Sequence, residues 1–387
     1  MYRKIQLFAV FLVFSGVMAF GQQSNVQFSP YGYIKFDSMY DTARTAYGDL
    51  GLWVMPENAA GGDEQELNFS ARETRFGLNI IAPENRGVKT TGRIEADFYE
   101  EIPTPNKYSP RLRLAYVDLA WENGWSLRFG QDWDTYISFH PDMVDGSALA
   151  YQGHLYGRHP QARITKDSKL GENTSLTLKL ALQHGRNSSD LDGNLQPDEN
   201  AAAVPNFHGS LVLKSRLLTD RQSVFAISGA YGREKLSGTA NPGTYENWLI
   251  HGGVQLPLSQ RFTLQGIVWK GANLDNYFGG IAQGIDVDKG TEIATYGGWG
   301  QLVYTLTKNT RTSVGYGIED PNDEDLSDRD PSGNARRTYN DRIFANFFYN
   351  ATDKVTFSVE YSLMRTDYTV SPDMQSHRVN FAALYRF

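Results

Sequence analysis

The chain of 387 residues contains no cysteine. Small secreted soluble proteins usually carry disulfides, because oxidising compartments favour them, so this absence is slightly unusual for that class. After residue 21 the sequence also lacks any run of about 18 apolar residues, which excludes a transmembrane helix. Mean hydropathy is polar at −0.46, although 13% of the residues are aromatic. A soluble protein would hide so many aromatic side chains in a core, whereas a β-barrel in lipid carries them on its outer face around a polar interior.

The first 21 residues have the pattern of a signal peptide. Arg3 and Lys4 precede an apolar run over 5–14, and small residues then lead to Ala19-Phe20-Gly21. The alternative is a membrane anchor, but the apolar run is too short for a bilayer, which needs about 20 residues. We therefore expect a cleaved leader over 1–21, followed by a single domain over 22–387.

Apolar and polar residues alternate strictly in several segments, which is typical of strands with one apolar and one polar face. The clearest segments are 92–98, 174–183 and 355–364. A soluble β-sandwich also alternates, so the connections must decide between the two classes. Here short turns, such as 122–124, 259–261 and 351–354, alternate with long connections rich in Gly, Asn, Asp and Pro. Short periplasmic turns and long outer loops are typical of outer-membrane barrels.

The alternating segments sum to sixteen, an even number that lets both ends of a barrel face the periplasm. The segment over 162–166 is short and alternates poorly. The predicted strands are 31–40, 67–81, 90–98, 111–121, 125–131, 162–166, 174–183, 207–218, 223–232, 248–258, 262–269, 294–305, 311–318, 341–350, 355–365 and 378–387. The long connections are predicted at 41–65, 99–110, 132–161, 184–206, 233–247, 270–293, 319–340 and 366–377. The fold class is therefore all-β, a 16-stranded antiparallel transmembrane barrel.

The chain ends inside an alternating segment whose last residue is aromatic. Soluble proteins rarely end within a strand, because chain ends fray. The terminal pattern resembles the signal that barrel assembly machinery recognises, and its aromatic members are Phe381, Tyr385 and Phe387. An ordinary edge strand is the alternative.

Charged residues on the polar face of the predicted strands are expected to line the lumen. Most of them are basic, whereas the acidic residues gather in long loops, as in 323–330 and 190–199. The lining candidates are Lys35, Asp37, Arg75, Arg93, Glu95, Asp97, Arg111, Arg113, Arg128, Lys179, Lys214, Arg216, Glu360 and Arg378. A basic stripe in a narrow channel concentrates anions. The alternative is that neighbours such as Arg93 and Glu95 pair and simply fill a wet interior.

The connection over 132–161 is rich in aromatic residues, which an exposed loop would not need. We expect it to fold into the barrel and form a constriction, since lumen-folded loops and rings of charge set pore selectivity. Its acidic residues, Asp132, Asp134, Asp142 and Asp145, are expected to face the basic strand residues Arg93, Arg111, Arg113 and Arg128. Use of this loop in subunit contacts is the alternative.

Five short motifs carry a resemblance to a known family. They are Tyr31-Gly-Tyr-Ile-Lys-Phe-Asp, Arg72-Glu-Thr-Arg-Phe-Gly, Gly92-Arg-Ile-Glu-Ala-Asp-Phe, Arg111-Leu-Arg-Leu-Ala-Tyr-Val-Asp-Leu and Leu127-Arg-Phe-Gly-Gln-Asp-Trp. In this order they resemble the first five strands of general bacterial porins, most of all the dicarboxylate-type (DcaP-like) branch. The resemblance implies trimeric channels that pass anionic solutes, with Arg93, Arg111, Arg113 and Arg128 as the basic wall. The long acidic loops depart from the family pattern.

Enzyme and metal functions have weaker support. His140, Asp142 and Ser147 are close in sequence, but no G-x-S-x-G turn surrounds the serine. His154 and His159 lack a helix or cysteines that would complete a zinc site. A surface divalent cation that bridges the acidic loops to lipopolysaccharide remains an alternative to the expectation of no cofactor. The negative net charge argues against nucleic acid as a partner.

We therefore expect an outer-membrane porin for passive diffusion of small anionic or polar solutes, assembled as a homotrimer in outer-membrane lipid and lipopolysaccharide. A plugged structural or adhesive barrel without transport is the alternative. Reversing Arg111 and Arg113 to glutamate is predicted to shift selectivity toward cations.

Overall fold

The computed structural model describes residues 25–99, 109–136, 139–184, 191 and 198–387. The predicted signal peptide and part of the connection over 99–110 lie outside these residues. No helix in the described part of the chain is long and apolar enough to cross a membrane.

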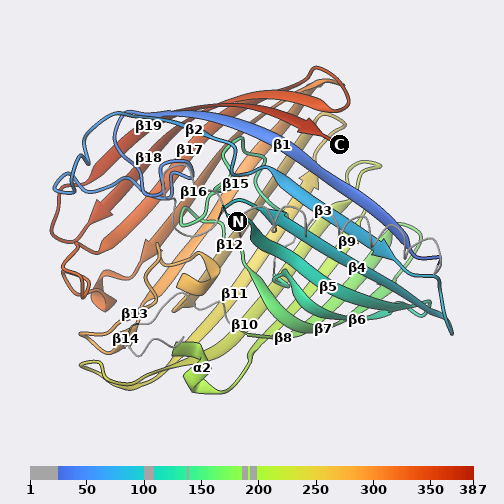
Figure 1. The fold of residues 1–387 in the computed structure, drawn as a ribbon, viewed down its shortest axis with the longest axis horizontal. Helices are drawn as coiled ribbons and strands as arrows, with labels where there is room; N and C mark the ends of the chain where they lie inside the picture. The colour runs from blue at the N-terminus through green and yellow to red at the C-terminus, as the bar shows by residue number, and fades with distance from the viewer. Residues whose placement is uncertain (1–24, 100–108, 137–138, 185–190, 192–197) are drawn as a thin grey trace, which may run out of the picture.

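One antiparallel sheet closes on itself (Figure 1). Its strands are β1 (Gln27–Asp41), β2 (Glu66–Ser70), β3 (Arg75–Ile81), β4 (Val88–Asp97), β5 (Arg111–Trp121), β6 (Trp125–Trp133), β7 (Arg158–Lys169), β8 (Thr174–Gln183), β9 (Asn206–Ser215), β10 (Ser223–Leu236), β11 (Gly243–Pro257), β12 (Phe262–Ala272), β15 (Ala294–Thr307), β16 (Thr310–Pro321), β17 (Arg337–Asn350), β18 (Val355–Tyr368) and β19 (Met374–Arg386). The barrel closes where β1 pairs with β19 on one side and with β2 and β3 on the other. Since β2 and β3 are two halves of one crossing, the 17 strands make 17 − 1 = 16 crossings. The predicted all-β, 16-stranded antiparallel barrel is confirmed.

The crossing formed by β2 and β3 is interrupted at residues 71–74. The ladder is replaced there by single hydrogen bonds, from Phe98 N to Arg72 O at 3.0 Å and from Lys35 N to Thr74 Oγ1 at 3.2 Å. The break frees Glu73 to reach into the lumen, where it contacts Lys35.

The two faces of the wall have opposite character, as the alternation predicted. In β12, Thr263, Gln265 and Trp269 are buried inside the barrel, while the intervening Leu264 and Val268 are exposed. The exposed fraction of Val268 is 71%, and Ile227 and Ile250 exceed 60%. Apolar side chains so exposed over a whole barrel require lipid rather than water as their solvent.

Several strands are longer than the alternation indicated. β7 spans Arg158–Lys169 instead of 162–166, and the connections after β10 and β18 shrink to 237–242 and 369–373. The backbone ladder continues beyond the apolar belt, where both faces are polar, so hydropathy gave no signal there. Loops of very different length therefore rise from one end of the barrel.

The long connections contain a few short elements of their own. These are α2 (Asp198–Ala202), the 3-10 turns η1 (Asp275–Tyr277) and η2 (Asp323–Asp325), and a small hairpin of β13 (Ile285–Asp286) and β14 (Thr291–Glu292). They lie at the end of the barrel opposite the short turns (Figure 1).

Candidate functional site

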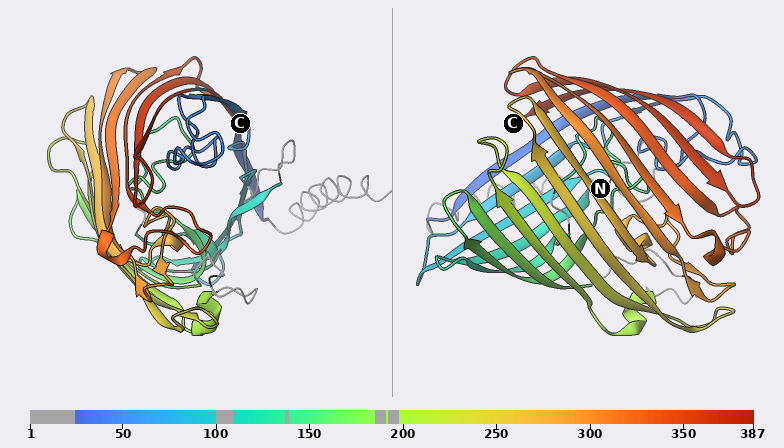
Figure 2. Two further views of the ribbon diagram at one scale, coloured as in Figure 1. Left: turned by 90° about the vertical axis from the view of Figure 1, so that its left-hand side faces the viewer. Right: turned by 180° about the vertical axis from the view of Figure 1, so that it is seen from behind.

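The connection between β6 and β7, residues 134–157 and here called loop 3, lies inside the barrel. The view along the barrel shows it within the ring of strands, together with the segment that follows β1 (Figure 2). Trp269 Nε1 on β12 donates to Gly153 O at 2.9 Å, and Gln265 Nε2 donates to His140 O at 3.1 Å. Loop 3 therefore leaves β6, crosses the lumen and contacts the far wall.

Apolar contacts hold one side of loop 3. Tyr136, Leu149 and Leu155 are fully buried against inward-facing residues of the wall, which are Leu249, Ile267, Trp269, Trp299 and Phe344. The burial of several large side chains stabilises such a contact by about 1.5–3 kcal/mol for each residue. This inner half of the wall, from β11 to β17, is thus apolar enough to seat a loop.

The loop backbone lies directly on the strands at two glycines. A Cβ on Gly317 of β16 would meet Gln152 O at 2.1 Å, and one on Gly153 would meet Gly298 O at 2.1 Å. Gly153 also has a φ of +109°, which side chains disfavour. Only glycine permits this close approach of loop 3 to β15 and β16.

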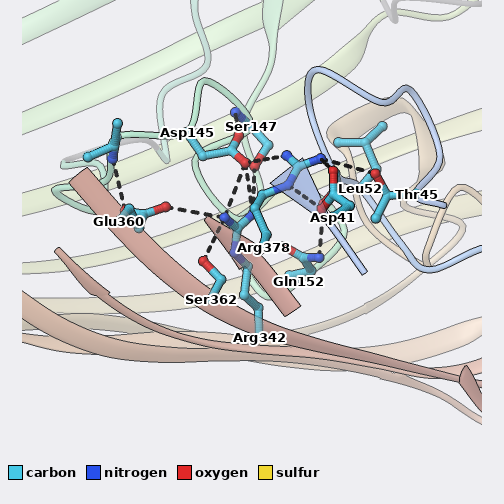
Figure 3. A network of polar contacts seen from close by, with 12 residues as sticks. Asp41, Thr45, Leu52, Asp145, Ser147, Gln152, Arg342, Glu360, Ser362 and Arg378 are labelled. Carbon is cyan, nitrogen blue, oxygen red and sulfur yellow. Dashed lines mark hydrogen bonds and ion pairs between the residues drawn. The ribbon is translucent and has the colours of Figure 1, made fainter. Parts of the chain in front are cut away.

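Buried ion pairs hold the other side of loop 3 (Figure 3). The Asp145 carboxylate accepts hydrogen bonds from Arg342 at 3.1 Å and from Arg378 at 2.8 Å. Arg378 also binds both carboxylate oxygens of Asp41 at 2.8 Å. Burial raises the pKa of Asp145, but the two guanidinium groups and the Ser147 N–H outweigh it and hold the pKa below its ordinary value.

Further polar contacts extend this cluster. Glu360 accepts from Arg342 at 3.2 Å and from the Val144 N–H at 2.9 Å. Asp142 forms a two-point pair with Arg311 at 2.7 and 2.9 Å. We call this set of residues on loop 3 and the wall the loop anchor, and it comprises Asp41, Asp142, Asp145, Arg311, Arg342, Glu360 and Arg378.

Lys35 joins loop 3 to the break in the second crossing. Its ammonium donates to Val144 O at 2.7 Å, lies 3.2 Å from Asp37 and contacts Glu73. Lys35 and Asp37 are both buried, so they contribute to loop position rather than to an open channel surface.

A cavity of about 310 Å³ lies between loop 3 and the opposite wall. Four arginines from β3, β5 and β7 line it: Arg75, Arg111, Arg113 and Arg158. We call these four residues the arginine wall. Glu73 and Asp145 also line the cavity, but each is bound by cations of its own outside the arginine wall.

Two carboxylates from β4 neutralise part of the arginine wall. Glu95 lies 2.7 Å from Arg113 and 3.6 Å from Arg75, and Asp97 lies 2.6 Å from Arg113 and 2.8 Å from Arg111. Among the described residues Arg158 forms no ion pair within 4.0 Å, and its guanidinium lies over the Trp133 ring at 4.7 Å. Positive charge therefore exceeds negative charge on this side of the cavity.

A second cavity of about 790 Å³ lies toward the short turns. Its cationic lining residues are Arg128, Arg163, Lys179 and Lys214, and its acidic ones are Asp118 and Asp167. Arg128 is paired with Asp118 at 2.8 Å and with Asp132 at 2.6 Å, and Arg163 shares Asp132 at 2.8 Å. The two cavities together form a cationic surface along β3–β9.

The structure places most of the predicted lining residues on the inner face, with exceptions. Arg93 lies on the same face of β4 as Glu95 and Asp97, and its guanidinium bonds to Asn79 at 2.9 Å beside the Tyr31 ring. Arg216 lies beyond the end of β9, exposed in a turn where it bonds to Asn173 at 3.3 Å, so its placement in the lumen was wrong. Glu360 and Arg378 face inward but are fully buried, Glu360 against loop 3 and Arg378 against loop 3 and the segment that follows β1.

The acidic residues of the predicted constriction have other partners than expected. Asp132 belongs to β6 and does meet Arg128. Asp134 is buried against His159 at 2.7 Å, whereas Asp142 and Asp145 bind the wall on the far side. The expected pairing across the cavity with Arg93, Arg111 and Arg113 was therefore wrong, since Asp142 pairs with Arg311 and Asp145 with Arg342 and Arg378.

Sequence reasoning missed Arg158 and Glu73, and it counted Trp133 only among the aromatic residues of the connection over 132–161. Trp133 and Arg158 are paired across β6 and β7 at positions that alternation assigns to the outer face, yet both line the cavity. Glu73 lies in the break between β2 and β3, where no period applies. Arg342 and Arg311 could have been found, because they alternate with apolar residues in β17 and β16.

The remaining predicted residues lie on the outside of the barrel. Phe381, Tyr385 and Phe387 are exposed on the outer face, and Phe387 packs near Phe76. Asp190 and Asp192 of one acidic loop lie outside the described residues. Within the described part no group of three or more His, Asp or Glu residues is arranged to hold a metal ion.

Solved structures with the same architecture are outer-membrane porins. The channel DcaP of Acinetobacter baumannii has a TM-score of 0.75 at 20% identity and covers 94% of this chain and 97% of that chain. The anion-selective porin from Comamonas acidovorans has a TM-score of 0.60 at 10% identity, with 94% and 100% covered. OprB of Pseudomonas putida has a TM-score of 0.57 at 10% identity and covers 93% of this chain and 94% of that chain. No family model and no curated protein sequence matches the chain.

The likeness predicted from five short motifs is confirmed at the level of the fold. The chain itself is a closed 16-crossing barrel with an apolar exterior, a largely polar interior and a loop folded inside. This chain has the fold of the bacterial outer-membrane porins.

Proposed function

We propose that the chain is an outer-membrane porin that lets small polar solutes diffuse passively and favours anions. The observation that carries this proposal is the arginine wall, where four guanidinium groups line a cavity in the lumen and only two carboxylates, Glu95 and Asp97, pair with them. A cationic surface inside low-dielectric walls raises the local concentration of anions. Loop 3 acts as the constriction, because it occupies the half of the lumen that the arginine wall leaves free.

The second cavity, which lies toward the short turns, supports the same preference for anions. Lys179 and Lys214 extend the cationic surface toward the short turns, so an anion that leaves the arginine wall meets further positive charge. Conduction needs several sites of moderate affinity along a path, which a series of cationic side chains provides.

The partners proposed from the sequence follow from this function. The apolar exterior is suited to outer-membrane lipid, with lipopolysaccharide around the long loops, and the terminal aromatic residues are suited to recognition by barrel assembly machinery. One of the similar solved structures is described as a trimer form, and we propose a homotrimer for this chain. A divalent cation between acidic loops and lipopolysaccharide remains a proposal without a described site.

The test is the reversal potential of the folded protein in a planar bilayer with a potassium chloride gradient. We expect steps in groups of three and a potential on the anion side. Arg158→Glu should move this potential toward the cation side, because the guanidinium lines the cavity and has no acidic partner within the described part of the chain.

Arg233→Glu is the matched control, because Arg233 is exposed at the rim of the barrel, where it pairs with Glu246. Cation selectivity of the unaltered protein would overturn the anion preference. Absence of conductance from folded protein would favour the plugged structural or adhesive barrel.

A further inference from the structure

Three ring side chains form a continuous chain of hydrogen bonds inside the barrel. Trp299 Nε1 on β15 donates to His154 Nδ1 at 3.0 Å. His154 Nε2 lies 2.9 Å from His140 Nδ1. Trp299 and His154 are buried, whereas the His140 ring is exposed to the lumen.

The chemistry of the three rings fixes the direction of this chain. An indole N–H can only donate, so His154 must accept at Nδ1 and carry its own proton on Nε2. His154 therefore donates to His140 Nδ1, and His140 in turn carries its proton on Nε2. The outcome is a neutral imidazole whose free nitrogen is an N–H donor.

The free end of this chain opens into the cavity of the arginine wall. His140 lines that cavity together with Arg75, Arg113 and Arg158. Its ring packs on Trp133 at 4.9 Å between centroids, and its carbonyl is held by Gln265. The Trp133 contact, the bond to His154 and the held carbonyl together restrict the orientation of the ring.

We propose that His140 is a specificity-determining residue, a fixed N–H donor that binds small organic carboxylates beside the arginine wall. This inference rests on the proposed function and deepens it. Guanidinium groups attract any anion, but a single directed N–H rewards an anion with a localised acceptor oxygen and a planar body that fits against Trp133. Trp299 and His154 act as positioning residues, because they determine which nitrogen of His140 carries the proton.

The environment keeps this donor neutral at ordinary pH. Enclosure by the barrel, together with the guanidinium groups of Arg113, Arg158 and Arg75, lowers the pKa of His140 to about 4. A neutral donor does not bind chloride as strongly as an added cation would, so it discriminates among anions instead of adding to the overall charge.

The experiment measures how strongly potassium benzoate blocks the chloride current of single channels. Four variants are compared with the unaltered protein: His140→Phe, His140→Gln, Trp299→Phe and the control His377→Phe. His377 is exposed on the outer face, where it contacts Tyr361 at 2.7 Å. Folding of each variant is checked by the heat-dependent gel mobility of the barrel.

We expect His140→Phe to raise the half-blocking benzoate concentration about ten-fold, since a hydrogen bond to a charged group is lost. His140→Gln keeps an N–H in the same place and should stay within about two-fold of the unaltered protein. Trp299→Phe keeps the ring contacts but no longer fixes which nitrogen of His154, and hence of His140, carries the proton. Its effect should therefore fall between those of the two His140 variants. His377→Phe should change nothing.

The proposal is overturned if benzoate blocks His140→Phe as strongly as the unaltered protein, or if it blocks His140→Gln as weakly as His140→Phe. It is also overturned if benzoate does not block the unaltered channel. Should His140→Phe fail to fold, Trp299→Phe and His140→Gln still decide the question. In each of these cases anion selectivity in potassium chloride can persist, whereas failure of the proposed function would remove that selectivity itself.

Discussion

Two regions inside the barrel are rich in arginine, yet they serve different purposes. In the loop anchor, Arg311, Arg342 and Arg378 meet four carboxylates, and the side chains of Arg342 and Arg378 are 0% exposed. In the arginine wall, Arg75, Arg111 and Arg113 share Glu95 and Asp97, Arg158 has no ion pair among the described residues, and the side chain of Arg111 is 22% exposed. The ratio of acids to cations therefore distinguishes an arginine that holds a loop from one that is proposed to attract a solute.

Burial deepens the difference. A buried ion pair returns little net stability compared with apolar packing, but loss of one partner is costly because the other charge remains without water. A cation in the lumen keeps its water and its long-range field. Substitutions should consequently alter stability and loop position in the loop anchor, and selectivity in the arginine wall.

The largest effect is expected from Arg378→Met. It leaves Asp41 buried without a partner and weakens the hold on Asp145, at a cost of about 3–5 kcal/mol. Loop 3 should leave the wall, so the single-channel conductance should rise and protease should cleave within 134–157. The measurement combines conductance, limited proteolysis and thermal unfolding followed by gel mobility.

The double variant Arg378→Met with Asp41→Leu is the matched control for that prediction. It removes both members of the pair, while Arg342 still holds Asp145, so much of the lost stability should return. Equal loss in the single and double variants would show that the pair itself does not position the loop.

An effect of intermediate size is expected from substitution of two nearby arginines of β5, Arg111 and Arg113. Arg113 is buried between Glu95 and Asp97, so Arg113→Gln should cost about 1.5–3 kcal/mol of stability. Arg111→Gln should cost less stability, because Arg111 is partly exposed and Asp97 keeps its bond to Arg113, and it should lower the chloride-to-potassium permeability ratio roughly two-fold. Thermal unfolding and reversal potentials, recorded on both variants, check the contrast. Identical behaviour of the two would erase the distinction between the regions for this strand.

The smallest effect concerns acid pH and loop 3. Desolvation inside the barrel and the guanidinium groups of Arg113, Arg158 and Arg75 lower the pKa of His140 to about 4, and burial lowers the pKa of His154 well below its ordinary value. Since these folded-state values lie below the ordinary 6.5, the neutral rings stabilise loop 3 fully above pH 6.5, and this contribution is lost as pH falls toward 4. Current noise should increase between pH 6.5 and 4. In the double variant His140→Gln with His154→Gln the pH dependence should disappear.

Much of the fold was predictable because the wall has a simple period. In β8 and β18, for example, every second residue is apolar, and lipid on one side and water on the other impose that pattern directly. The ends of β7, β10 and β18 were not predictable, because backbone pairing continues where both faces are polar. The alternation of apolar residues reflects which solvent each face meets, whereas a strand ends where its backbone hydrogen bonds end.

The site was predictable only in part, for a different reason. Alternation placed Arg111 and Arg113 on the inner face, but it could not show that Arg113 is neutralised by Glu95 and Asp97. Asp145 has two arginine partners, Arg342 and Arg378, which lie about 200 residues or more further along the chain. They meet Asp145 only because loop 3 crosses the lumen. One usable signal was present, since the inward positions of β12 and β15 carry Ile267, Trp269 and Trp299 where a water-filled wall would be polar.

The seat of loop 3 on one side of the barrel makes the open path eccentric. Strand number fixes the circumference of the cylinder, but both cavities lie to one side of it, with their cationic side chains on β3–β9. In the proposed channel a solute would therefore travel along a surface rather than down an axis, within reach of cationic side chains for much of the passage. Flux of well-bound anions should then saturate with concentration, as it does for a carrier, although nothing in the barrel has to move.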